Sequence, residues 1–160
     1  MTEPEEIIEA EFVAALAAAV PNLDVIGALS PAFEGETKHA ALSGISVYAD
    51  LASQGLDWKG PGVPCTYAVR IVLRVEEADD KTFALFRDSA RRIRSVLSAH
   101  LGDGCGNLGR DGFVCDSFTL DSTETNLEAS GEGAAMVKTY NATVAGRYIP
   151  PTETTEQEEN

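Results

Sequence analysis

Residues 65–75 read C-T-Y-A-V-R-I-V-L-R-V, and this stretch decides the fold. Its cysteine, tyrosine and alternate aliphatic side chains would point to one face, while Arg70, Val72 and Arg74 would point to the other. The period of two, the β-branched residues and the lack of internal glycine or proline predict a long strand with one face in a core. The half-polar opposite face is typical of an antiparallel sheet covered on one side. A second long run, 135–148, is its predicted partner.

The segments around this strand predict an α+β fold. Apolar residues at helical spacing follow Pro4, and the same spacing returns after Asp79 and Asp80. The predicted order begins with a helix from Glu5 that Pro21-Asn22 ends, strands at 23–29 and 45–51, and the strand 65–75. A helix follows from Asp80 to about Leu101, with an apolar stripe of Phe83, Phe86, Ala90, Ile93, Leu97 and Leu101. The chain then continues with a strand from 113 to about 120, a polar loop through Gly133, and the strand 135–148. These elements predict an antiparallel or mixed sheet of about four to five strands, with two main helices packed on one face.

Length and composition fit one domain over residues 1–149. A chain of 160 residues is long enough to bury about 70% of its unfolded surface. Residues 150–160 begin with two prolines and continue as an acidic tail without apolar residues to bury, so this tail is predicted to be disordered.

The net charge of −14 restricts the classes of partner. So acidic a surface disfavours non-specific binding to DNA or to an anionic membrane. The acidic start lacks the basic segment of a signal peptide, and no apolar run reaches the length of a membrane span. Three cysteines, Cys65, Cys105 and Cys115, form no C-x-x-C pair, so neither a disulfide framework nor a zinc cluster is expected. These features predict synthesis in a reducing, intracellular compartment.

The sequence contains no convincing catalytic motif. Residues 104–109 match G-x-G-x-x-G, but a predicted helix precedes them and a strand follows, the reverse of the dinucleotide-binding arrangement. The histidines, His39 and His100, show no metal-binding spacing. A Cys105 or Cys115 nucleophile paired with His100 is conceivable, but no orienting acid accompanies it. We therefore predict no catalytic, cofactor-binding or metal site, and a small enzyme or ligand-binding domain is the less favoured alternative.

Arg87, Arg91, Arg92 and Arg94 lie within eight positions of the second predicted helix, and they are the candidate subunit-interface residues. One interpretation is a solvated helix face on which Asp88 pairs with Arg91 or Arg92. The other is a basic face that docks on an acidic face of a neighbouring copy, where complementary charge sets the register. Such a head-to-tail contact closes into a ring when the rotation permits. Nucleic-acid binding is disfavoured because no aromatic residues interleave with the arginines.

Trp58 is a further interface candidate. It lies in the run 55–64, whose glycines and prolines predict a loop. A loop tryptophan either packs against its own domain or anchors an interface.

The layout resembles the tail-terminator or tail-completion proteins of long-tailed bacteriophages and prophages. An acidic amphipathic helix leads to I-S-V-Y-A-D at 45–50, a loop, and the strand 65–75. A helix ending in I-R-S-V-L at 93–97 and the strand V-K-T-Y-N-A-T-V-A-G-R-Y at 137–148 complete the resemblance.

The resemblance implies a virion structural protein made in the host bacterial cytoplasm, with no cofactor and no reaction. Proteins of this kind form a hexameric ring that caps the tail tube, ends its polymerisation and meets the head-side connector. The implied partners are other copies of the chain, the tail tube protein and the connector or neck protein, while DNA passes without specific binding and no membrane is involved. A head–neck completion protein or another minor tail protein is the alternative.

Overall fold

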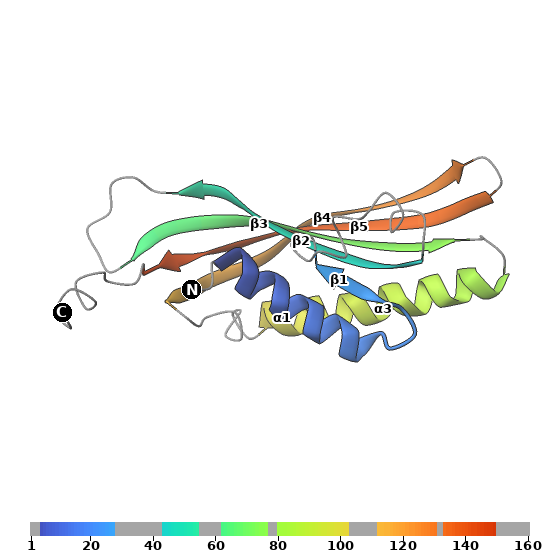
Figure 1. The fold of residues 1–160 in the computed structure, drawn as a ribbon, viewed down its shortest axis with the longest axis horizontal. Helices are drawn as coiled ribbons and strands as arrows, with labels where there is room; N and C mark the ends of the chain where they lie inside the picture. Colours follow the sequence, from blue (N-terminus) through green and yellow to red (C-terminus); the bar gives the residue numbers. More distant parts are fainter. Residues whose placement is uncertain are drawn as a thin grey trace, which may run out of the picture.

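A five-stranded sheet runs along the molecule, and the two described helices lie on one of its faces (Figure 1). The computed structural model describes residues 4–27, 43–54, 62–76, 80–102, 112–130 and 133–149. The elements are α1 (Pro4–Ala19), β1 (Val25–Gly27), β2 (Gly44–Gln54), β3 (Val63–Glu76), α3 (Asp80–Gly102), β4 (Phe113–Ser130) and β5 (Gly133–Tyr148). The strand order is β1-β2-β3-β5-β4, in which β1 and β2 are parallel and the other pairs are antiparallel. The predicted α+β fold, a mixed sheet with two helices on one face, is confirmed.

β3 is the central strand, between β2 and β5. Its alternate side chains from Val63 to Val75 are all buried, whereas the intervening ones are half-buried or exposed. The strand predicted at 65–75 is therefore confirmed, with the predicted face in the core. Its predicted partner is confirmed as well, because β5 pairs with it from Val63 opposite Tyr148 to Glu76 opposite Ala135. We call the face beneath the helices the covered face and the other the open face.

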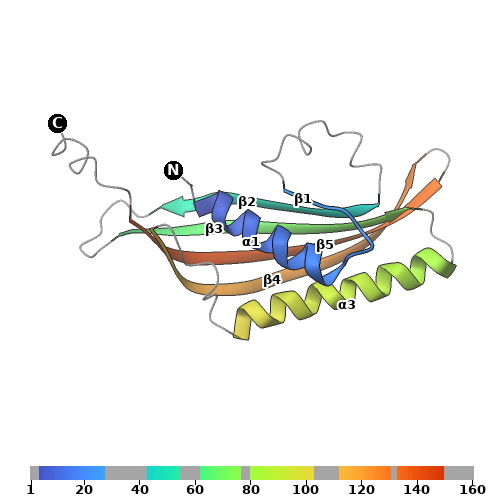
Figure 2. The ribbon, with the colours of Figure 1, turned by 60° about the horizontal axis from the view of Figure 1, so that its bottom comes forward.

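α1 covers the β1–β2 side of the sheet (Figure 2). Ile8, Phe12 and Leu16 are buried at helical spacing, as the sequence predicted, and Ile7 joins them. The Phe12 ring lies 5.4 Å from that of Phe118 in β4, so α1 also reaches across the covered face. These contacts join the first helix to a strand about a hundred residues later, which is the kind of long-range packing that supplies most helical stability in proteins.

α3 packs on β3, β5 and β4 through the predicted apolar stripe. Phe86, Ile93 and Leu97 are buried, but Phe83 is 49% exposed, so its predicted place in the core is wrong. At helical spacing Phe83 lies about 60° to one side of Phe86, and Ser89 lies about 60° to the other. The helix is turned so that the small Ser89 side chain is buried and the Phe83 ring is left at the surface.

β4 is much longer than the sequence predicted. The expected polar loop through Gly133 is wrong, because β4 continues to Ser130 and pairs with β5 as far as Gly133. Every side chain from Asp121 to Leu127 is exposed, so this half of the edge strand is held by backbone pairing and has no core face. Without a buried face, the sequence carries no hydrophobic alternation. Register shifts after Cys115 and Leu120 further disturb the period.

The close packing of β4 against β5 at Gly146 yields a stability prediction. A Cβ added at Gly146 would lie 2.2 Å from the Val114 carbonyl oxygen and 2.8 Å from the Phe113 ring, which is buried. We expect Gly146→Ala to lower the free energy of unfolding by about 1–3 kcal/mol in urea titrations, because neither the backbone nor the packed ring can move away. Ala145→Ser adds one atom to the neighbouring residue on the open face and should stay within about 0.5 kcal/mol of the wild type. Equal stability for Gly146→Ala would contradict this packing.

Candidate functional site

The four predicted interface arginines are all exposed on α3, whereas Trp58 lies outside the described residues. Three of the four lie close to neighbouring charged, aromatic or backbone groups within the chain. Their arrangement divides the helix into two flanks with different surroundings.

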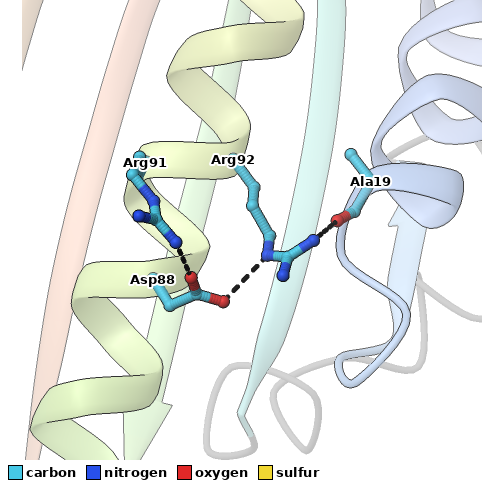
Figure 3. A network of polar contacts seen from close by, with 4 residues as sticks. All are labelled: Ala19, Asp88, Arg91 and Arg92. Carbon is cyan, nitrogen blue, oxygen red and sulfur yellow. Dashed lines mark hydrogen bonds and ion pairs between the residues drawn. The ribbon is translucent and has the colours of Figure 1, made fainter.

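Asp88 pairs with two of the arginines (Figure 3). Arg91 forms an ion pair with one carboxylate oxygen, and Nε of Arg92 donates to the other at 2.8 Å. The hydrogen bonds from Arg92 and Arg91 lower the pKa of Asp88 below its usual value. The intrahelical pairing that the sequence predicted is therefore confirmed.

Arg92 also joins the two helices. Its NH1 donates to the carbonyl oxygen of Ala19, the last residue of α1, at 3.1 Å (Figure 3). The last carbonyls of a helix lack intrahelical partners and carry partial negative charge, so a guanidinium is a favourable donor there. One side chain thus bridges Asp88 of its own helix and the end of α1. The sequence could not predict this bond, because it depends on how the helices pack.

The opposite flank of α3 points away from α1. Arg94 is two residues beyond Arg92 and so lies about 160° away around the helix, while Arg87, seven residues before Arg94, returns to nearly the same side. The guanidinium of Arg87 lies 5.7 Å from the centre of the Phe83 ring, in the range of a cation–π contact. We call Phe83, Arg87, Arg91 and Arg94 the outer flank. The spacing of four between Phe83 and Arg87 was the available signal for this contact.

Tyr140 of β5 lies beneath this part of α3. Its hydroxyl donates to the carbonyl oxygen of Ala90 at 3.3 Å. Burial raises the pKa of Tyr140 to about 12, and the positive charge of Arg94 acts in the opposite direction. Arg94 is therefore within electrostatic reach of β5, and it forms no ion pair with the part of the chain that the structure describes.

The open face is polar, and many of its side chains bond to one another. Thr143 Oγ1 donates to one oxygen of Asp121 at 2.5 Å, and Thr119 Oγ1 donates to the other at 3.2 Å. Arg147 pairs with Asp116 at 3.3 Å. Asp116 and Asp121 are the residues at which the register of β4 shifts, and their carboxylates accept from β5. These bonds join side chains within the sheet, so the polar groups concerned already have partners in the same chain.

The cysteines give a different result from the one expected. Cys115 is disulfide-bonded, and its partner lies outside the described residues, whereas Cys65 is a free thiol buried on β3. A disulfide sulfur is not a thiolate, so the conceivable Cys115–His100 nucleophile pair is wrong for this state of the chain. The alternative nucleophile Cys105 and the side chain of His100 lie outside the described part.

Metal-binding groups and membrane-spanning helices are both absent from the described ranges. No group of three His, Cys, Asp or Glu side chains in these ranges is placed to hold a metal ion. Of the described helices, neither is long and apolar enough to cross a membrane.

Comparison with known proteins gives a fold relationship. No protein-family model matches the chain, and no curated protein sequence does. Among solved structures, the fold is similar to that of a chain in the virion of a native gene transfer agent particle, with a TM-score of 0.54 and 18% sequence identity. The match covers 89% of this chain and 96% of the other, so nearly the whole architecture is shared.

Substitutions on the two flanks of α3 should have different effects on stability. We expect Arg92→Ala to lower the free energy of unfolding by about 1 kcal/mol, because the carbonyl of Ala19 loses a charged donor. Arg94→Ala, on the outer flank of the same helix, should change stability by less than about 0.5 kcal/mol. Urea unfolding followed by circular dichroism compares the two variants directly. Equal losses would show that the bridge to α1 does not contribute.

Proposed function

We propose that this chain is a structural protein of a tailed, phage-like virion and that it works as a tail terminator. Copies assemble into a hexameric ring that caps the tail tube and ends its polymerisation. The chain acts without cofactor or reaction. The observation that carries this proposal is the fold likeness to a chain of a virion, which extends over nearly the full length of both chains.

The surfaces of the molecule support assembly with other copies. The two helices that the structure describes lie on the same face of the sheet, and the outer flank of α3 places three arginines at the surface of a protein with a net charge of −14. Complementary charges orient protein partners and set their register. In this proposal Arg87, Arg91 and Arg94 contact the neighbouring copy, with Trp58 as a further candidate anchor. Arg92 contributes mainly through its bridge to α1.

The ring meets two other virion components. The tail tube protein lies on one side of it and the head-side connector or neck protein on the other. DNA passes through the opening without specific binding, because an acidic protein repels the phosphate backbone. The assembled ring is part of the virion tail.

The proposal predicts both an oligomeric mass and an assembly defect. Native mass spectrometry over a range of protein concentrations, with and without purified tail tubes, should detect a species of about 100 kDa, since six copies of 17.0 kDa close a ring. Particles produced without this protein should carry tails longer than normal in electron micrographs, because nothing stops tube growth.

The form of the defect separates this role from its neighbours in the virion. Tails of normal length that are not joined to heads would contradict termination and indicate a neck role instead. Complementation with the wild-type chain restores normal tails if the defect arises from loss of this protein alone.

A further inference from the structure

The charges of this chain are separated between elements. Residues 4–27 and 43–54, which form α1, β1 and β2, contain six acidic residues and no lysine, arginine or histidine. In contrast, α3 contains five lysines and arginines against two aspartates. β4 is acidic as well, with four aspartates and glutamates and no lysine or arginine. The contrast is therefore between one basic helix and acidic elements elsewhere in the same chain.

On the covered face the acidic elements lie toward the β1 edge, and the basic helix lies beside them over β3, β5 and β4. α1 packs mainly on β1 and β2, whereas α3 packs on β3, β5 and β4 (Figure 2). We call the surface formed by α1, β1 and β2 the acidic side.

The outer flank is the part of α3 that points away from the acidic side of its own chain. Arg92 faces α1 and bonds to Ala19, so the arginines about 100–160° further around the helix face the other way. The exposed Phe83 lies on the same flank. An exposed aromatic ring beside arginines has the composition of an interface anchor.

We propose that the outer flank of α3 in one copy docks on the acidic side of the next copy. This inference rests on the proposed ring and names the two surfaces that meet in it. The occupant is a second copy because the chain itself carries the complementary charge on the acidic side. A contact between two different surfaces of the chain repeats head to tail, and a repeated head-to-tail contact closes into a ring when the rotation permits.

The chemistry of the contact follows from the residue types. Arginine pairs with carboxylates through a fork of N–H donors and remains charged when partly buried. Asp24 and Asp50 are exposed carboxylates of the acidic side, the first directly before β1 and the second in the later half of β2. The register shifts of β4 make its edge irregular. Such an edge disfavours strand pairing between copies, so the proposed contact uses side chains.

Two charge-reversed proteins test the contact. The first carries Arg87→Glu with Arg94→Glu on the outer flank, and the second carries Asp24→Lys with Asp50→Lys on the acidic side. We expect each protein alone to remain folded by circular dichroism and to assemble at least about tenfold more weakly than the wild type. Mixed in equal amounts they should assemble again, because each reversed surface then meets a surface of opposite charge. Native mass spectrometry should show equal numbers of the two proteins in each ring.

Lys81→Glu and Glu124→Lys are the matched controls. Each makes a single charge reversal of the same sign as one of the double variants, at an exposed position outside the two surfaces, and both should assemble like the wild type.

The outcomes separate this inference from the proposed function. Normal assembly of the outer-flank protein, or no recovery on mixing while the wild type forms rings, would overturn the proposed contact and leave the ring intact. A wild type that stays monomeric at every concentration and on tail tubes would overturn both.

Discussion

The burial of one face of β3 is the constraint on which the rest of the structure depends. Its alternate side chains from Val63 to Val75 lie in the core, and Arg70 and Arg74 occupy the open face. A slip of one residue against either neighbouring strand would exchange the two faces and put both arginines beneath the helices. Burying an unpaired charge costs several kcal/mol, so the hydrophobic alternation of this strand fixes its register with β2 and β5.

The packing of both helices on this one face determines where the acidic and basic residues lie. α1 and α3 lie beside each other on it, and α1 brings the acidic part of the chain to the β1–β2 edge (Figure 2). Where the helices meet, Arg92 bonds to both Asp88 and Ala19, and the remaining arginines are left on the outer flank. This arrangement supports the proposed function, since a protein with a basic helix flank and a separate acidic surface is suited to repeated contact with its own copies.

Burial explains what the sequence could predict. The strand at 65–75 and the α3 stripe from Phe86 to Leu97 show periods of two and about 3.6, because packing against a core selects apolar residues at those spacings. The pairing of Asp88 with Arg91 and Arg92 was predictable too, since helical geometry alone brings residues three and four apart together.

Features that depend on tertiary contacts could not be predicted. The second half of β4 has no buried face and is recognisable only through its pairing with β5. The exposure of Phe83 depends on how α3 is turned on the sheet, and the bond from Arg92 to Ala19 depends on the approach of α1. The disulfide of Cys115 depends on which segments meet in space, and the cysteine count alone pointed the other way.

An electron cryo-microscopy reconstruction of the protein assembled on tail tubes tests the central claim most directly. The account predicts a closed ring in which the outer flank of each α3 faces the α1, β1 and β2 elements of the adjacent subunit. A ring in which every outer flank faces solvent while other surfaces join the subunits would contradict it.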